Sequence, residues 1–310
     1  MPIMLEGNVK PDLAPIALFV YCRPDHTKQT VEALLRNPEA ASSDLIVYSD
    51  APANTLAEES VAQVRGYVRE ITGFRTLKVI ERESNLGLAA SIINGVSQQL
   101  QLHGQLIVME DDLVVSPFFL SFMNEGLRRY VNDERVASIH GYMYPIKIDL
   151  PEAIFLQGAD CWGWATWSRA WQHFEPDGRK LAVELRQRKM VIDFDLEGRQ
   201  PFFRMLKQQI AGKNNSWAIR WHASIFLAGM LTLYPGRSHV VNIGVDGSGT
   251  HCQTRVDLGD ELSLTPTYWS NFPVQVDYAA RDALGDYFRL LRTRLWWARL
   301  CRIIGLRSDN

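Results

Sequence analysis

Three consecutive carboxylates, Glu110, Asp111 and Asp112, are the residues of this sequence that point most directly to chemistry. They follow the mostly apolar run 105–109 (QLIVM), which is too short for a buried helix and predicts a central strand that ends in acid. Ligands of open α/β sheets bind beyond the carboxyl ends of the strands. Clustered carboxylates repel one another unless a cation lies among them, and hard oxygen ligands favour Mg²⁺ or Mn²⁺, usually shared with substrate phosphates. The triplet therefore predicts a metal site for a diphosphate; the alternative is a solvated acidic turn before a helix at Phe118.

Apolar runs and helical periodicity predict how these acids are positioned. The expected strands are residues 16–21, 45–48, 77–80 and 105–109, and the expected helices are residues 27–35, 56–71 and 85–102. Strands that alternate with helices imply right-handed crossovers and a mostly parallel sheet. In such a sheet the loops that carry Arg23, Asp50, Asn85 and the acidic triplet lie along one edge.

Composition limits the class of protein. A chain of 310 residues with 46% hydrophobic content can bury one large core, or a core and a small appendage. Its net charge of -2 argues against nucleic-acid binding, because no excess of Lys and Arg is available for phosphates. The four cysteines lie far apart, which predicts neither a zinc site nor a disulfide framework and fits the reducing cytosol. No secretory signal and no 18-residue apolar run is recognisable, so we expect a cytoplasmic protein that does not span a membrane.

The acidic triplet and two further motifs resemble nucleotide-sugar glycosyltransferases of the GT-A type, most closely N-acetylglucosaminyltransferase I and its bacterial relatives. The motifs are EDD at 110–112, Arg23 in YCRPDHT and Asp50 in VYSDAP. The resemblance implies that Asp112 binds Mn²⁺ (or Mg²⁺) directly, while Glu110 and Asp111 contact the donor and order the site. It assigns Arg23 to the diphosphate and Asp50 to the uracil of a UDP-sugar. A basic residue in a solvated loop and a turn-forming Asp are the alternatives.

Residues 158–171 (GADCWGWATWSRAW) contain four tryptophans. The spacing of Trp167 and Trp171 predicts that both lie on one face of a helix. Trp162 and Trp164 flank Gly163 before that helix, where an aromatic ring can stack on a sugar and glycine permits close approach. The resembled family has a Gly-Trp at this place in its acceptor region. We therefore expect Trp162 or Trp164 to bind the acceptor, with a role in the core as the alternative.

Two later segments supply further candidates. Residues 214–235 predict a helix that Ser216 caps, followed by a strand that ends before Pro235. Trp217 and Arg220 on that helix are candidates for acceptor binding, unless the helix only underlies the site. Residues 245–252 (VDGSGTHC) form a glycine-rich loop that presents His251 and can close over the donor. His251 and Asn85 complete the expected donor-binding residues.

The catalytic base is where the sequence departs from the resembled family. An inverting transferase needs a carboxylate that takes the proton of the acceptor hydroxyl. The family has an aspartate just before a Trp at a helix start, but the matching residues here are Asn214, Asn215 and Ser216, which are not bases. Asp160 is the preferred substitute, and Asp111 is also expected to be a catalytic residue. The other candidates are Asp195, Glu197, His222 and His251. Retention of configuration, which needs no base, or loss of activity are the alternatives.

The expected fold is a GT-A-like (Rossmann-like) α/β domain over residues 14–252, a mostly parallel mixed sheet flanked by helices. A C-terminal extension, residues 253–310, contains a predicted helix over 278–306 with many Arg, Leu and Trp residues. Such a helix can lie on an anionic membrane surface, which would place the protein on the inner face of the cytoplasmic membrane, or it can pack on the catalytic domain.

The expected function is metal-dependent transfer of a hexosyl or N-acetylhexosaminyl group from a UDP-sugar to a carbohydrate or lipid-linked acceptor. Bacterial surface polysaccharide or lipopolysaccharide assembly is the expected context, by resemblance. A sugar nucleotidyltransferase is an alternative, but its glycine-rich basic loop after the first strand is missing. A non-catalytic sugar-binding module is a third possibility.

Overall fold

The structure is a computed structural model that describes residues 13–245 and 261–303. In these residues eight strands form one sheet in the order β3-β2-β1-β4-β8-β6-β9-β7. The strands are β1 (Ile16–Val20), β2 (Asp44–Ser49), β3 (Thr76–Glu81), β4 (Gln105–Glu110), β6 (Val136–His140), β7 (Ala153–Gln157), β8 (Trp164–Trp167) and β9 (Leu231–Pro235). Strands β1 to β4 run parallel, as do β6 and β9, whereas β8 and β7 pair antiparallel with their neighbours. The predicted α/β fold with a mostly parallel mixed sheet is confirmed.

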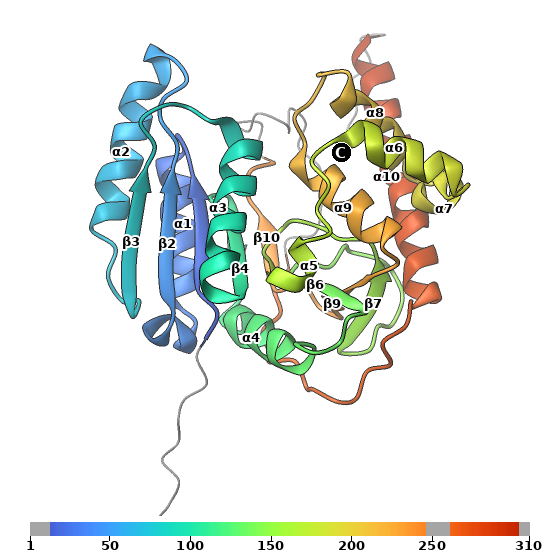
Figure 1. The fold of residues 1–310 in the computed structure, drawn as a ribbon, viewed down its shortest axis with the longest axis horizontal. Helices are drawn as coiled ribbons and strands as arrows, with labels where there is room; N and C mark the ends of the chain where they lie inside the picture. Colours follow the sequence, from blue (N-terminus) through green and yellow to red (C-terminus); the bar gives the residue numbers. More distant parts are fainter. Residues whose placement is uncertain (1–12, 246–260, 304–310) are drawn as a thin grey trace, which may run out of the picture.

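Helices cover both faces of this sheet (Figure 1). One core contains side chains of α1 (Pro24–Leu35), α2 (Glu58–Arg69) and α4 (Phe119–Arg129) packed on the sheet. A second core contains side chains of α3 (Gly87–His103), α5 (Ser168–Trp171) and α9 (Trp217–Leu227). The result is three layers with helices outside and the sheet inside.

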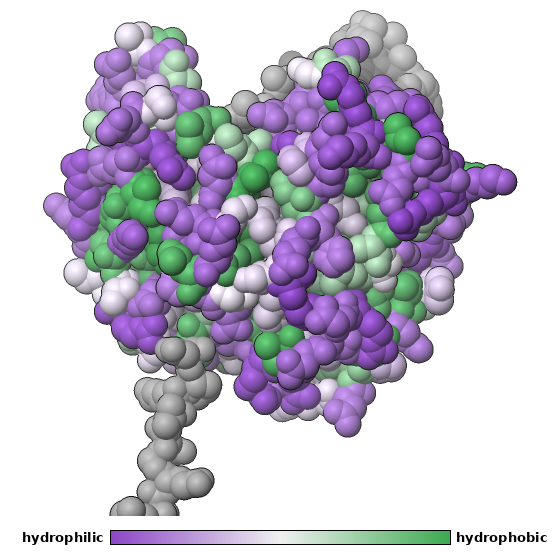
Figure 2. All heavy atoms as spheres, in the orientation of Figure 1, coloured by the Kyte–Doolittle hydropathy of each residue, from purple (hydrophilic) through white to green (hydrophobic). Residues whose placement is uncertain are grey.

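A lobe of short helices lies beside the sheet and has its own apolar core. It contains α6 (Gly178–Gln187), α7 (Val191–Phe194) and α8 (Phe202–Ile210), which pack against α9. Leu185, Phe194 and Leu206 are almost completely buried there. Figure 2 shows the molecule hollowed along its upper edge, between this lobe and the part that holds α2, β3 and α3.

The C-terminal helix α10 (Tyr278–Ile303) confirms the expected helical extension. Ala280, Leu284 and Phe288 of α10 are buried against Ile154 of β7 and Tyr234 of β9. The first part of α10 thus packs on the sheet, as one of the two alternatives requires. None of the helices in the two described ranges combines the length and the apolarity needed to cross a membrane. The division of the chain at residue 252 stays a prediction.

The prediction that Trp167 and Trp171 share a helical face is wrong. Trp164–Trp167 is β8, which pairs with β4 through Val108 and with β6 through His140. Only Trp171 lies in a helix, α5, and the two rings belong to the cores on opposite faces of the sheet. Strand pairing, which the local pattern does not reveal, decides the conformation here. The sequence analysis also did not predict three short strands, which are β7, β5 (Leu113–Val115) and β10 (Val240–Asn242).

Candidate active site

The acidic triplet lies where β4 ends, beside the end of β1. Phe19 of β1 is in register with Glu110, so the residues after β1 lie next to Asp111 and Asp112. The backbone N–H of Tyr21 donates to Asp111 Oδ2 over 3.2 Å. The loops after β1, β2 and β4 therefore meet at one edge, as parallel pairing requires.

Arg23 links the two aspartates of the triplet. Its Nη2 lies 2.5 Å from Asp111 Oδ1 and 2.9 Å from Asp112 Oδ2. Asp111 is buried and its backbone carbonyl accepts a hydrogen bond from the Thr30 hydroxyl of α1, whereas Asp112 keeps 15% of its side chain exposed. Asp111 thus anchors the arginine, and Asp112 is the member of the pair that faces outward.

The charges of this site are not balanced. Three carboxylates face a single guanidinium, and burial together with the charges of Asp112 and Asp111 raises the pKa of Glu110 to about 8. Burial also raises the pKa of Asp111, although Arg23 opposes this. A cation would offset this repulsion.

Gly244 lies directly against the triplet. Strand β10 pairs antiparallel with β5, and Ile243 N–H donates to the Asp112 carbonyl over 2.9 Å. A Cβ atom at Gly244 would lie 2.1 Å from Asp112 Oδ2 and 2.8 Å from Arg23 Nη1. Glycine permits this approach without displacing either side chain, so the segment after β10 closes one side of the Asp112 carboxylate.

The donor set fits a divalent metal that a substrate helps to hold. Within residues 13–245 and 261–303, no three His, Cys, Asp or Glu side chains converge as a complete metal site. Mg²⁺ and similar ions are commonly bound by one or two carboxylates and substrate phosphates, with waters in the remaining positions. The outward carboxylate of Asp112, with Glu110 beside it, meets that requirement.

Asp50 has structural partners at the neighbouring strand end. Its carboxylate accepts hydrogen bonds from the backbone N–H groups of Ala51, Leu86 and Gly87 at 2.8–3.2 Å. Leu86 and Gly87 begin α3, so Asp50 caps that helix and compensates its dipole. Asn85 is exposed, and its amide donates to the Ala51 carbonyl over 2.6 Å. The predicted contact of Asp50 with uracil stays a prediction, and it would compete with these bonds.

Asp160 lies in a second cluster, on the segment between β7 and β8. The hydroxyls of Tyr234 and Tyr144 donate to its Oδ2 over 3.0 and 3.2 Å. Burial, with additional effects from Glu110, Asp160 and Asp112, raises the pKa of the Cys161 thiol well above its usual value. Strand β8 pairs antiparallel with β4, with Val108 opposite Trp164, so the segment before β8 that carries Asp160 approaches the end of β4 where the triplet begins.

Of the residues predicted to bind the acceptor, only Trp162 is partly exposed. Its ring packs edge-on against Tyr142, with centroids 4.8 Å apart. Trp164 and Trp217 are buried and stack on each other, and Arg220 is buried with its guanidinium donating to backbone carbonyls. These three contribute to the core beneath the site, because their polar or aromatic groups are enclosed by protein.

The less preferred base candidates have structural partners. Asp195 accepts from Phe203 N–H at the start of α8, and Glu197 forms an ion pair with Arg281. His222 bonds the Ala159 carbonyl, and burial lowers its pKa. His251 lies outside the described residues.

The sequence did not reveal three residues of this neighbourhood: Tyr144, Tyr234 and Gly244. Gly244 carries a usable signal, since a glycine after a short apolar run marks close backbone approach. Nothing in the local sequence connects either tyrosine with Asp160, because the contacts span 16 and 74 residues.

Comparison with known proteins adds two similar structures. No protein-family model and no curated protein matches the chain. The structure of the mannosyltransferase PcManGT from Pyrobaculum calidifontis in complex with GDP-Man and Mn²⁺ is similar over 70% of this chain and 72% of its own, with 11% identity and a TM-score of 0.38. S. aureus TarS is similar over 47% of this chain and 24% of its own, with 14% identity and a TM-score of 0.30. This chain thus spans about a quarter of TarS, and likeness at these values carries no argument about function.

Proposed function

We propose that the protein is a metal-dependent glycosyltransferase that moves a hexosyl or N-acetylhexosaminyl group from a UDP-sugar to a carbohydrate or lipid-linked acceptor. One observation carries this proposal. The outward carboxylate of Asp112 is paired with Arg23 just after β4, and the segment before β8 that carries the partly exposed Asp160 approaches the same strand end. This register supports a diphosphate site and a candidate base on neighbouring segments of the chain.

Each residue would perform a separate task. Asp112 and Glu110 would hold Mn²⁺ or Mg²⁺, which when bound neutralises the charge of the leaving diphosphate. Arg23 would turn from Asp112 toward the diphosphate and bind it. Its ion pair with Asp111 would remain. Asn85, Asp50 and His251 remain the proposed further contacts of the donor.

Asp160 would act on the acceptor. It would take the proton of the acceptor hydroxyl as that oxygen bonds to C1 of the sugar. The bond from C1 to the diphosphate oxygen breaks at the same time, and UDP leaves with the electron pair. Trp162, partly exposed and two residues after Asp160, would provide the aromatic surface for the acceptor sugar.

Calorimetry with UDP and MnCl₂ tests the metal site. Asp112→Asn removes the outward carboxylate, so we expect the Mn²⁺-dependent part of UDP affinity to be lost. Asp149→Asn, at an exposed acid elsewhere, is the matched control and should bind like the parent. An Asp112→Asn protein that folds and binds UDP with Mn²⁺ as tightly as the parent would refute the assignment.

We further propose that the exposed face of α10 binds an anionic membrane surface. Arg289, Arg292 and Arg294 are exposed on α10, as is Leu290, beyond the part of the helix that packs on the sheet. Flotation with vesicles of phosphatidylglycerol and phosphatidylcholine tests this. The parent should float, and a variant with the three arginines changed to glutamate should float less; a parent that stays with the soluble fraction overturns the proposal.

A further inference from the structure

Asp160 is held by two tyrosines through one of its oxygens. The described hydrogen bonds of this carboxylate, from Tyr234 and Tyr144, both end on Oδ2. Tyr234 belongs to β9 and Tyr144 to the segment after β6, so two separate parts of the chain fix the carboxyl plane. Two donors on Oδ2 hold that oxygen, and none of the described hydrogen bonds ends on Oδ1.

The described groups that contact or neighbour Asp160 are neutral. Burial, with the charge of Asp160, raises the pKa of both Tyr144 and Tyr234 well above the usual value, so both phenols keep the protons that they donate. The two neighbouring imidazoles, His140 and His222, have pKa values lowered by burial and are neutral at pH 7. Neutral donors thus hold Asp160, unlike Asp111, which pairs with a guanidinium.

Helix α10 packs against Tyr144. The ring of Tyr144 packs edge-on against Phe288, with centroids 5.0 Å apart, and lies 5.9 Å from the ring of Tyr287. Phe288 is buried and also contacts Phe202 of α8. The helical lobe and α10 therefore enclose the ring whose hydroxyl reaches Asp160.

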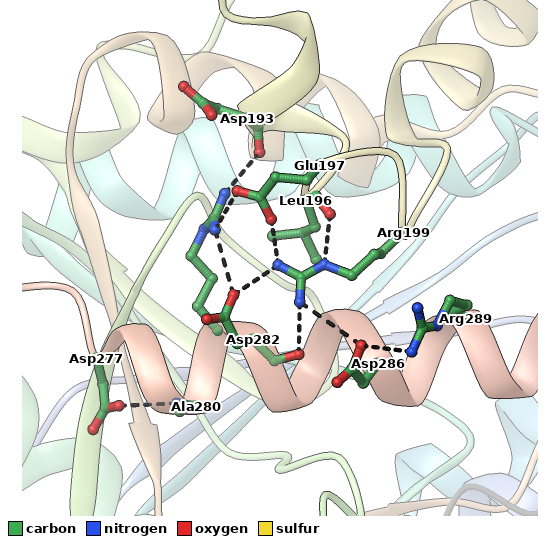
Figure 3. Close-up of polar contacts among 10 residues, drawn as sticks. Asp193, Leu196, Glu197, Arg199, Asp277, Ala280, Asp282, Asp286 and Arg289 are labelled. Atoms are coloured by element: carbon green, nitrogen blue, oxygen red, sulfur yellow. Dashed lines mark hydrogen bonds and ion pairs between the residues drawn. The ribbon is translucent and has the colours of Figure 1, made fainter.

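An ion-pair network joins α10 to the loop before α8, about two turns before this contact (Figure 3). Arg199, from the loop before α8, lies across the helix and donates to Asp282 Oδ1 over 2.7 Å and to the Asp282 carbonyl over 3.0 Å. Arg281 of α10 returns an ion pair of 2.6 Å to Glu197. A Cβ at Gly285 would lie 2.6 Å from Arg199 Nε, so glycine permits the crossing. The network joins α10 to the loop before α8, on the same helix that carries Phe288.

We propose that Tyr144 and Tyr234 are positioning residues that orient Asp160 for proton transfer, and that α10 holds Tyr144 in place through Phe288. This inference rests on the glycosyltransferase function proposed above. The C-terminal extension would then contribute to the reaction, because α10 packs on Tyr144 and Tyr144 orients Asp160.

Tyr144→Phe and Tyr234→Phe test the inference, because each removes one hydroxyl and keeps the ring. The assay follows UDP release from UDP-glucose, UDP-galactose, UDP-N-acetylglucosamine and UDP-N-acetylgalactosamine with MnCl₂. We expect kcat to fall about 10-fold for each variant, since a hydrogen bond to a charged group is lost. Donor KM and UDP affinity by calorimetry should stay unchanged, and the acid limb of the pH–rate profile should move to higher pH. Tyr278→Phe, the same change at a tyrosine that is 69% exposed, should behave like the parent.

A second pair of variants tests the support from α10. Phe288→Leu removes the ring against Tyr144 and keeps an apolar side chain, so we expect kcat to fall about 3- to 10-fold, less than or equal to the loss from a single tyrosine hydroxyl. Thr293→Ala, at an exposed position of the same helix, should leave kcat unchanged.

The outcomes separate the two proposals. Tyrosine variants that keep the parental kcat and pH profile, while the parent releases UDP, overturn this inference and leave the proposed function standing. Donor KM rising together with a falling unfolding temperature would show a merely structural role and would also overturn it. A parent that releases UDP from none of the four donors refutes the proposed function, and the inference with it.

Discussion

Substitution of Gly244 by alanine probes the closest contact of the candidate metal site. The new Cβ would lie 2.1 Å from Asp112 Oδ2, whereas real Cβ atoms essentially never approach within 3.0 Å. The Asp112 carboxylate must therefore move by about 1 Å, and a displacement of that size can cost about 10²-fold in activity. Arg23 Nη1, 2.8 Å from the same Cβ, must move as well.

The expected result of Gly244→Ala follows from this overlap. Mn²⁺-dependent UDP affinity, measured by calorimetry, should fall by about 10- to 100-fold, which corresponds to about 1.4–2.8 kcal/mol. The free energy of unfolding, measured with urea, should fall by about 1–3 kcal/mol, as for other overpacked sites.

Gly66→Ala is the matched control. Gly66 lies in α2, and a Cβ there would meet nothing within 4 Å. This variant should bind UDP like the parent and gain about 0.5–1 kcal/mol of stability, because alanine favours the helix over glycine. If Gly244→Ala binds UDP with Mn²⁺ as tightly as Gly66→Ala does, Gly244 does not shape the site and the reasoning fails.

Three further predictions address other parts of the structure. Arg23→Ala should weaken UDP binding by about 1.5–3 kcal/mol in calorimetry, as expected for hydrogen bonds to a charged group; unchanged affinity removes Arg23 from the diphosphate. Asp50→Ala should lower the free energy of unfolding by about 1 kcal/mol, because α3 loses its cap; a loss of UDP affinity in addition would support the uracil contact. Burial lowers the pKa of His239 from 6.5 to about 4, so the stability that this neutral group contributes is complete above pH 6.5 and is lost as the pH falls toward 4. Between pH 7 and 4 the free energy of unfolding, measured with urea, should fall by up to about 3 kcal/mol less in His239→Gln than in the parent. Equal decreases in the two proteins would contradict this.

The parallel half of the sheet could be predicted because its signals are local. The strand at residues 105–109 and its three predecessors are short apolar runs, and the rule that parallel strands end at one edge correctly brings Arg23 next to the acidic triplet. One helix cap was also recognisable, since Ser216 accepts from Ile219 N–H at the start of α9.

The second half depends on contacts between distant residues. Trp164 to Trp167 have a pattern that suits a helix start, yet β4 and β6 on either side convert them into a strand. Trp164 is then enclosed by Trp171, Trp217 and Trp221, so an aromatic residue beside a glycine became a core residue.

The candidate base illustrates the same limit within the site. Asp160 could be selected because a turn before aromatic residues suits an acceptor. Its orientation could not be predicted, since Tyr144 and Tyr234 reach it only after β6, β7 and β9 assemble. For Asp50 the position could be predicted but the partner could not. A carboxylate at a strand end can bind a nucleotide or cap a helix N-terminus, and in the structure it accepts from the N–H groups at the start of α3.

The most direct test of the proposed function is to identify the product released from a nucleotide sugar. The protein would be incubated with MnCl₂, the four UDP-sugars and a panel of carbohydrate acceptors, and UDP and pyrophosphate would be separated by chromatography. Metal-dependent transfer predicts that UDP appears together with a glycosylated acceptor, and that Asp112→Asn abolishes both. Release of pyrophosphate would instead indicate a nucleotidyltransferase, and donors that remain intact with every acceptor would contradict a catalytic role.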